Sequence, residues 1–300
     1  SVLNDIQAGQ TLADALRRHP KVFTDLYVNM VAAGEAGGIL DTILDRLAIF
    51  LEKNDALTRK IKGAMTYPAV VLVVVVGATT ILLWQVVPVF AGIFQDAGMQ
   101  LPTPTRVVLG ISEFLQNYIH FLFLGIIALA FAIRQYYQTA PGRLAIDKAL
   151  LKFPILGTLI RKAAVARFTR TLGTLVSSGV SILEGLEITA RTAGNRVVHD
   201  AVMQSRKSIA GGATIADPLK ASGVFPPMVV QMINVGEQTG GLDEMLSKIA
   251  DFYDDEVDAA VTALTSILEP VMIVIMGVVI GGMVVAMYLP MFDLIQTVQG

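Results

Sequence analysis

Three uncharged, apolar stretches set the strongest limit on how this chain can fold. No Asp, Glu, Lys or Arg occurs in residues 63–95, 114–133 or 270–292. A helix rises about 1.5 Å per residue, so each stretch is long enough to cross a hydrocarbon core about 30 Å thick. The 300-residue chain is 54% hydrophobic and 16% charged, as expected if part of it lies in lipid. The stretches therefore predict three membrane-spanning helices.

Basic residues predict the orientation of these helices. Three basic residues at 59–62 precede the first stretch, and six at 134–162 follow the second. Residues 91–116, between the two stretches, contain a single basic residue. Because segments rich in Lys and Arg next to a span stay in the cytoplasm, both basic flanks are expected there, and the third stretch then runs outward by alternation.

The chain therefore divides into seven segments with the bulk in the cytoplasm and the C-terminus on the outer side. We expect cytoplasmic segments at 1–66 and 138–266, membrane helices at 67–92, 117–137 and 267–292, an outer loop at 93–116 and an outer tail at 293–300.

The cytoplasmic segments show helical spacing and no convincing strand pattern. Apolar residues recur at steps of three and four after residue 40 and again after residue 242, which places an apolar stripe on one face of each helix. The remaining pattern predicts helices at 144–153, 156–176, 181–193 and 196–210. A compact antiparallel bundle is the expected arrangement.

An internal repeat organises the chain. VAAGEAGGILD at 31–41 recurs as INVGEQTGGLD at 233–243, an offset of 202 residues. The same offset relates prolines in the first and third apolar stretches, so one register holds across a soluble helix and a membrane span. This indicates a duplicated unit made of a cytoplasmic bundle and an outgoing span. The paired positions are Gly34 and Gly236, Glu35 and Glu237, Gly38 and Gly240, Leu40 and Leu242, Asp41 and Asp243, Pro68 and Pro270, and Pro88 and Pro290.

The repeat has two consequences for the fold. The prolines of each copy lie 20 residues apart and bracket about 30 Å of helix, so Pro68 and Pro270 are expected to mark a helix start or a kink at the membrane. Helices at about 156–208 have no counterpart before Ile6, so we expect that the chain lacks an N-terminal part of the natural protein; a short first copy is the rival explanation. The predicted fold is an all-α membrane protein with two related cytoplasmic bundles, the first truncated, and three transmembrane helices.

The repeated phrase, with its pattern Gly-Glu-x-x-Gly-x-Leu-Asp, and several longer segments resemble the repeated domain of the type II secretion F and type IV pilus platform family. These segments are MTYPAVVLVVVVG at 65–77, LPTPTRVVLGISEF at 101–114, RFTRTLGTLVSSGVSILEGLEI at 167–188 and YLPMF at 288–292. The resemblance covers essentially the whole chain. The ending YLPMFDLIQTVQ is more similar to the pilus branch than to the secretion branch.

The resemblance implies a multi-pass platform protein of the bacterial inner membrane, with its outer segments in the periplasm. Its implied partners are cytoplasmic hexameric pilus ATPases, pilin subunits, other inner-membrane and cytoplasmic ring components, and a second copy of itself. It would couple ATPase motion to insertion or removal of pilins at the fibre base. The platform of a type II secretion system is the alternative reading, and a small repeat-built transporter is a more remote one.

Composition and motifs argue against an enzyme or a nucleic-acid binder. The net charge of −2 is not that of a typical nucleic-acid-binding protein, and with no cysteine the chain has no disulfide, zinc–thiolate or thiol chemistry. The phosphate loop GxxxxGK[ST], HExxH and GxSxG are all missing from the sequence. We therefore expect no catalytic residue, cofactor or resident metal.

The repeated carboxylates admit two interpretations. Glu35, Asp41, Glu237 and Asp243 could be metal ligands or partner contacts. The local interpretation, which we favour, is structural. Asp41 and Asp243 fall in a first helical turn, where a carboxylate favours the positive end of the helix dipole, and the two glutamates accept bonds from free backbone N–H groups there.

Two further features are candidate interaction sites. The acidic run at 251–258 includes Asp254, Asp255 and Glu256, which could form a docking surface for a basic patch on a partner; the simpler interpretation is a solvated helix face. Gly277 and Gly281 form a GxxxG pair in the third apolar stretch, which suits close packing against another membrane helix.

Overall fold

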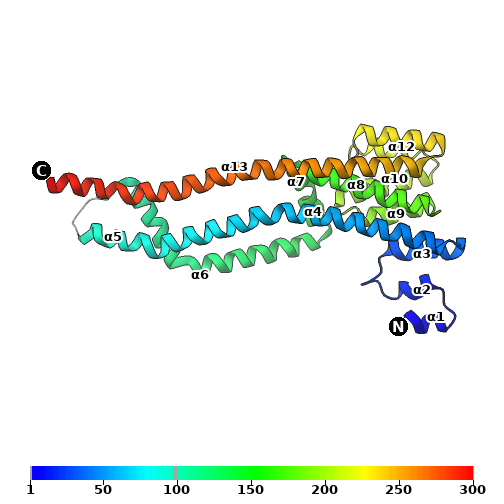
Figure 1. The fold of residues 1–300 in the computed structure, drawn as a ribbon, viewed down its shortest axis with the longest axis horizontal. Coiled ribbons are helices and arrows are strands. Elements are labelled where there is room, and N and C mark those ends of the chain that lie inside the picture. The colour runs from blue at the N-terminus through cyan, green and yellow to red at the C-terminus, as the bar shows by residue number, and fades with distance from the viewer. Residues whose placement is uncertain (1, 97–100, 300) are drawn as a thin grey trace. The chain divides into compact units, whose positions relative to one another are not determined.

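The described chain is helical throughout. A computed structural model describes the main chain of residues 2–96 and 101–299 and the side chains of residues 2–93 and 101–290, and no strand occurs among these residues. Figure 1 shows the order of the helices. The all-α membrane architecture predicted from the sequence is confirmed.

The first copy contains short helices followed by one long one. They are α1 (Val2–Gln7), α2 (Leu12–Arg17), α3 (Asp25–Gly37), α4 (Leu40–Ile81), a π-helical turn η1 (Leu82–Val86) and α5 (Val87–Asp96). The linking helix is α6 (Thr103–Gln138). The second copy comprises α7 (Ala140–Lys152), α8 (Leu156–Ser177), α9 (Ile182–Thr192), α10 (Arg196–Ala210), α11 (Ala216–Ala221), α12 (Pro227–Thr239) and α13 (Leu242–Gln299).

The chain divides into two compact units. The bundle unit comprises residues 1–61 and 140–261, and the membrane unit comprises residues 62–139 and 262–300. Three helical stretches are long and apolar enough to cross a membrane, at Leu40–Ile93, Thr103–Gln138 and Leu242–Pro290. At most 17% of the most apolar part of each stretch is buried, so their apolar side chains face outward, as lipid-facing residues do.

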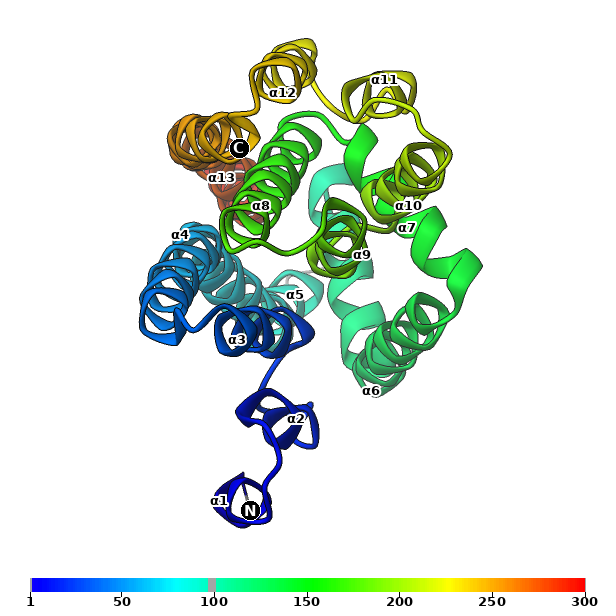
Figure 2. The ribbon, with the colours of Figure 1, turned by 90° about the vertical axis from the view of Figure 1, so that its right-hand side faces the viewer.

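The two copies share one core in the bundle unit. Met30, Ile43 and Leu47 of the first copy pack in the same cluster as Leu175 and Ile188 of the second. Figure 2, which looks along the bundle, shows α8 and α9 beside α3 and α4. The short first copy therefore buries its apolar surface against the second. This burial stabilises the fold by about 25 cal/mol for each Å² of apolar surface removed from water.

The structure adds detail to two expectations about the membrane segments. Residues 103–116, expected in an outer loop, form the first turns of α6. Pro68 and Pro270 lie inside α4 and α13, which begin 28 residues earlier, so neither proline starts a helix. The main chain of the expected tail is helical to Gln299, and the side chains of residues 291–300 lie outside the described residues.

Candidate functional site

The repeated phrase forms a joint between two helices in each copy. In the first copy α3 ends at Gly37, and Gly38 takes the left-handed conformation with φ 66°. The N–H of Ile39 donates to the oxygen of Gly34 at 3.0 Å, which closes the end of α3 before α4 begins at Leu40. In the second copy Gly240 ends α12 with φ 75°, and α13 begins at Leu242. A left-handed glycine at this position is a common way to end a helix.

The first glycine of each phrase permits close helix packing. A Cβ atom on Gly34 would lie 3.0 Å from Cγ1 of Ile43 in α4. A Cβ atom on Gly236 would lie 2.9 Å from Cα of Leu242 in α13. The helices on either side of each joint therefore touch at a residue without a side chain.

The glutamate of each phrase binds the start of an upstream helix. The carboxylate of Glu35 accepts hydrogen bonds from the N–H groups of Leu12 at 2.7 Å and Ala13 at 2.9 Å, at the start of α2. The carboxylate of Glu237 accepts from Ile215 at 2.9 Å and from Ala216 at 3.4 Å, at the start of α11.

These glutamate contacts satisfy N–H groups that the first turn of a helix leaves free. They differ from our expectation in one respect, because the N–H groups belong to an earlier helix and not to the helix that follows the phrase. The aspartates do lie in the first turn of that following helix, Asp41 in α4 and Asp243 in α13. Among the described residues, no group of three or more His, Asp or Glu side chains could hold a metal ion.

The second proline of each copy lies next to a polar contact from α6. A proline ring disturbs the carbonyl four residues earlier and donates no hydrogen bond. For Pro88 that carbonyl is on Trp84, within the π-helical turn η1, and Nε2 of Gln116 donates to it at 3.3 Å. For Pro290 it is on Ala286, and the hydroxyl of Thr105 donates to it at 2.5 Å.

A third polar side chain of α6 makes the same kind of contact. The hydroxyl of Ser112 donates to the oxygen of Leu83, also in η1. Ser112 is 1% exposed and Thr105 is 5% exposed. Leu83, Val87 and Met283 form a small apolar core around these contacts. One helix therefore binds equivalent positions in both copies, which the sequence did not predict, although polar side chains on one face of α6 were the available signal.

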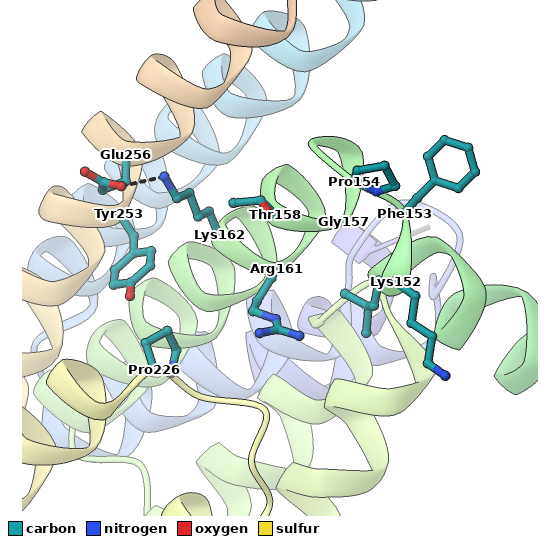
Figure 3. A pocket seen from close by; sticks show the side chains of 11 residues that line it. Lys152, Phe153, Pro154, Gly157, Thr158, Arg161, Lys162, Pro226, Tyr253 and Glu256 are labelled. Atoms are coloured by element: carbon teal, nitrogen blue, oxygen red, sulfur yellow. Dashed lines mark ion pairs between the residues drawn. The ribbon is translucent and has the colours of Figure 1, made fainter.

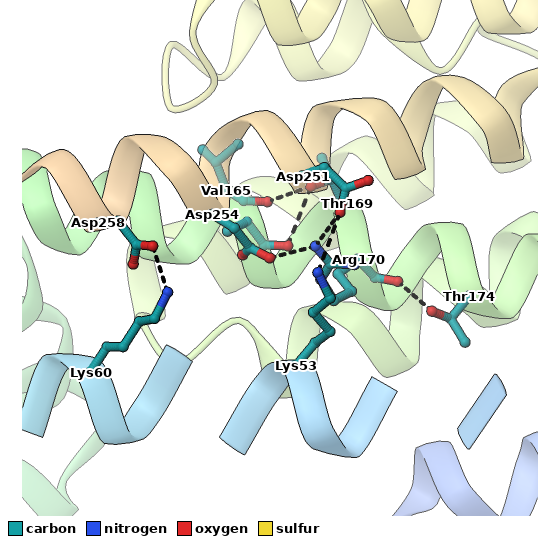
Figure 4. A network of polar contacts seen from close by, with 10 residues as sticks. Lys53, Lys60, Val165, Thr169, Arg170, Thr174, Asp251, Asp254 and Asp258 are labelled. Atoms are coloured by element: carbon teal, nitrogen blue, oxygen red, sulfur yellow. Dashed lines mark hydrogen bonds and ion pairs between the residues drawn. The ribbon is translucent and has the colours of Figure 1, made fainter. Parts of the chain in front are cut away.

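The acidic run of α13 is engaged by basic residues of the same unit (Figure 4). Nη2 of Arg170 in α8 lies 2.5 Å from Oδ2 of Asp254 and 3.0 Å from Oδ1 of Asp251. Nζ of Lys60 in α4 lies 2.5 Å from Oδ2 of Asp258. The α8 and α13 helices of the second copy and the α4 helix of the first are thus joined by ion pairs.

The three acidic residues proposed for docking differ in their surroundings. Asp254 pairs with Arg170, and Oε2 of Glu256 lies 2.6 Å from Nζ of Lys162. Asp255 is exposed. Burial raises the pKa of Asp254, and the guanidinium of Arg170 acts in the opposite direction.

The two glycines proposed for helix packing face open space. A Cβ atom on Gly277 or Gly281 would meet no atom within 4 Å in the described structure. Both lie in α13, and the apolar residues Ile273 and Val278 beside them are exposed. This face of α13 is therefore free to pack against another helix.

Comparison with known proteins agrees with the repeat. The family model of type II secretion system (T2SS) protein F matches residues 1–88 and 168–290. The two matches end at the paired prolines Pro88 and Pro290.

The relatives include proteins of two machines. The chain is 52% identical over 299 residues to the type IV pilus assembly protein PilC of Myxococcus xanthus. This alignment covers 100% of the chain and 72% of the Myxococcus protein. It is 49% identical over 302 residues to the protein of the same name from Thermus thermophilus, covering 99% and 73%. The type II secretion system protein F of Vibrio cholerae is 36% identical over 256 residues, covering 85% and 63%.

Proposed function

This chain belongs to the type II secretion system protein F family, and we propose that it is the inner-membrane platform of a type IV pilus assembly machine. The observation that carries the proposal is the difference in identity between the two groups of relatives. The pilus assembly proteins of Myxococcus and Thermus are 52% and 49% identical to it, and the Vibrio secretion protein is 36% identical. The membrane setting rests on the three apolar helices and the family.

The proposed role is structural and force-transmitting, with the energy supplied by a partner ATPase. Each copy places a joint at the start of a long continuous helix, α4 or α13. Glycine contacts and a glutamate bound to an upstream helix restrain each joint. A displacement of the helices before a joint would therefore be passed to the long helix, because a continuous helix and its packed neighbours move as rigid elements.

The proposed partners are cytoplasmic hexameric pilus ATPases, further ring components and pilin subunits. Within the acidic run we propose Asp255 as the docking residue, because its carboxylate is exposed while Asp254 and Glu256 engage Arg170 and Lys162. The test is affinity purification from native membranes of the source organism. The wild-type chain should recover the pilus ATPase, Asp255→Lys should recover much less, and Glu244→Lys, an exposed control on the same helix, should match the wild type.

We propose a homodimer that uses the Gly277 and Gly281 face of α13. The chain contains no cysteine, so a single introduced thiol reports contact cleanly. Gly281→Cys should form a disulfide-linked dimer in membranes under mild oxidation, whereas Ile275→Cys on the opposite side of the helix should remain monomeric. Equal cross-linking by both variants would contradict this interface.

The proposed orientation places the bundle in the cytoplasm and the C-terminus in the periplasm. A fusion of alkaline phosphatase after Gly300 should show phosphatase activity. A fusion of green fluorescent protein at the same position should show no fluorescence. The reverse result would overturn the orientation.

The choice of machine is tested by deleting the gene and restoring it. Loss of surface pili with normal protein secretion supports the pilus platform. Loss of secretion with normal piliation would establish the type II secretion alternative.

A further inference from the structure

Helix α7 begins directly after a membrane-spanning helix. The uncharged stretch of α6 is followed by Arg134, α6 ends at Gln138 and α7 starts at Ala140. Helix rises about 1.5 Å per residue, so this length of chain brings α7 to within about 10 Å of the hydrocarbon core. Tyr136, which is 51% exposed, is a residue type that favours the headgroup layer. The chain itself therefore places the first turn of α7 close to the membrane surface.

The end of α7 and the turn after it carry exposed apolar side chains. Leu150 is 36% exposed, Phe153 is 63% exposed and Ile155 is 39% exposed, and we call these three residues the apolar corner. Figure 3 shows the ring of Phe153 pointing out of the turn, away from the side chains of Arg161 and Tyr253. Apolar side chains that are grouped and exposed in this way mark a contact with a membrane or with another protein.

The packing of α7 holds the apolar corner on the outside. Oδ2 of Asp147 accepts a hydrogen bond from the N–H of Arg196 at 2.6 Å, which joins α7 to the start of α10. A Cβ atom on Gly157 would lie 2.4 Å from the oxygen of Leu151, so the start of α8 touches the end of α7. A rotation of α7 that buried Phe153 would break both contacts. The exposure of the apolar corner is therefore fixed by the fold.

The main chain of the corner is strained at an apolar residue. Ile155 has φ 66°, in a region that β-branched residues rarely adopt and that glycine adopts readily. Glycine at this position would relieve the strain, but it would also remove one of the exposed apolar side chains. Strained residues of this kind gather at functional sites.

The charged residues that surround the corner are basic. Residues 134–162 contain six basic residues, and the acidic residue of this range, Asp147, is 2% exposed. Lys148 and Lys152 are exposed. Phe153 and Lys152 leave the chain in different directions in Figure 3, as apolar and charged side chains do on a helix that lies in a membrane surface. The long stems of lysines let their amino groups reach lipid headgroups from the side of such a helix.

We propose that α7 lies on the membrane surface, with Leu150, Phe153 and Ile155 in contact with lipid and with Lys148 and Lys152 at the headgroups of anionic lipids. Chain continuity with α6 favours lipid over a protein partner, because it holds α7 beside the bilayer. The excess of basic residues favours anionic lipid over neutral lipid. The proposal goes beyond the platform role and rests only on the membrane setting of the chain. It gives the bundle unit an attachment to the membrane besides its spanning helices.

The test uses a fluorescent label on single introduced cysteines, which the cysteine-free chain allows. The full chain is placed in nanodiscs of phosphatidylcholine and phosphatidylglycerol that contain a lipid with a nitroxide quencher on its headgroup. Labels in Phe153→Cys and Leu150→Cys should be quenched several times more strongly than the label in Val22→Cys. Val22 is the matched control, because it is an apolar residue of the same bundle unit and is 72% exposed.

A second arm tests the preference for anionic lipid. Omitting phosphatidylglycerol should reduce the quenching at position 153, and so should the combined variant Lys148→Gln and Lys152→Gln in nanodiscs that contain it. Lys207→Gln, which removes an exposed cation of α10, should leave the quenching unchanged. Unfolding temperatures of the labelled variants establish that they fold.

Three results would overturn the proposal. One is quenching at position 153 that is no stronger than at position 22. Another is label emission at position 153 that shifts to shorter wavelength without quenching, which would show that protein and not lipid covers the apolar corner. The third is quenching that responds neither to phosphatidylglycerol nor to the two lysines. None of these measurements involves a pilus machine, so each result would leave the proposed platform function standing.

Discussion

The hydroxyl of Thr105 donates a hydrogen bond to the main-chain oxygen of Ala286, which lies four residues before Pro290. The equivalent oxygen of the first copy, on Trp84, accepts a hydrogen bond from Gln116 of the same helix. Thus α6, which belongs to neither copy of the repeat, binds both copies at the carbonyl that a proline has disturbed.

Removing the Thr105 hydroxyl should destabilise the membrane unit. Thr105→Val keeps the shape of the side chain and leaves the Ala286 oxygen without its donor, so we expect a loss of about 1–2 kcal/mol in the free energy of unfolding. The measurement is denaturant unfolding in a fixed detergent. Thr103→Val, on the exposed side of the same turn, is the matched control, and an equal loss in both variants would contradict the prediction.

Removing the glutamate of a joint should loosen the helix that it binds. Glu237→Ala leaves the N–H groups of Ile215 and Ala216 without an acceptor, so we expect a loss of about 1–2 kcal/mol in the free energy of unfolding. Hydrogen exchange should increase at those two amides. Glu237→Gln should lose less because one acceptor oxygen remains. Glu244→Ala, whose side chain is 65% exposed, should change the stability by less than about 0.5 kcal/mol.

A methyl group on the first glycine of a joint should separate the two helices. In Gly236→Ala the new atom lies 2.9 Å from Cα of Leu242, and main chain cannot move aside easily, so we expect a loss of about 1–3 kcal/mol. At Gly241 the nearest atom to an added Cβ is 3.7 Å away, so Gly241→Ala is the control. The measurement is the thermal unfolding temperature of Gly236→Ala and of Gly241→Ala. A similar temperature in both variants would contradict this explanation.

The stability of the bundle unit should depend on pH through Asp254. Because burial raises the folded-state pKa of Asp254 above its usual value, the folded state holds this proton more tightly than the unfolded state does. Stability from this group is therefore present at pH values below the unfolded pKa and is lost as pH rises through the folded pKa. As pH rises from the unfolded pKa of Asp254 through its folded pKa, the unfolding free energy of the wild type should fall relative to that of Asp254→Asn. A constant difference between the two proteins would contradict the prediction.

Large side chains at Gly277 and Gly281 should block assembly and leave folding intact. An added Cβ meets no atom within 4 Å at either position in the described structure, so Gly277→Leu should unfold at the wild-type temperature. If this face packs against a partner helix, cells carrying the variant should lose surface pili. Val278→Leu, at a position that is 69% exposed, is the control. Normal piliation with Gly277→Leu would show that this face makes no contact that assembly requires.

Periodicity was enough to predict several of the longer helices, because apolar spacing is a local property of the chain. The helices expected at 156–176 and 196–210 appear as Leu156–Ser177 and Arg196–Ala210. The start of α6 was not predicted, because residues 93–116 were assigned as a whole to the segment between two membrane spans, although Pro104 within a first helical turn is well tolerated.

The contacts of the site were harder to predict because they join residues far apart in the chain. The repeat identified Glu35 and Glu237 as important, but their N–H donors lie about 22 residues earlier and carry no distinctive side chain. Likewise, Arg170 and Asp254 are 84 residues apart, and only the packing of α8 against α13 brings them together. Sequence spacing indicates which residues share a helix face, but not which face another helix covers.

The ion pairs between α4 and α13 show that the two copies are no longer interchangeable. Lys53 and Lys60 lie on the first copy, and their acidic partners Asp251 and Asp258 lie on the second. At the offset of 202, Asp251 and Asp258 correspond to Ile49 and Ala56, which carry no charge. A chain built from two first copies would therefore leave both lysines without a counter-charge. The two copies therefore contribute opposite charges to the contact between α4 and α13, and neither copy could replace the other there.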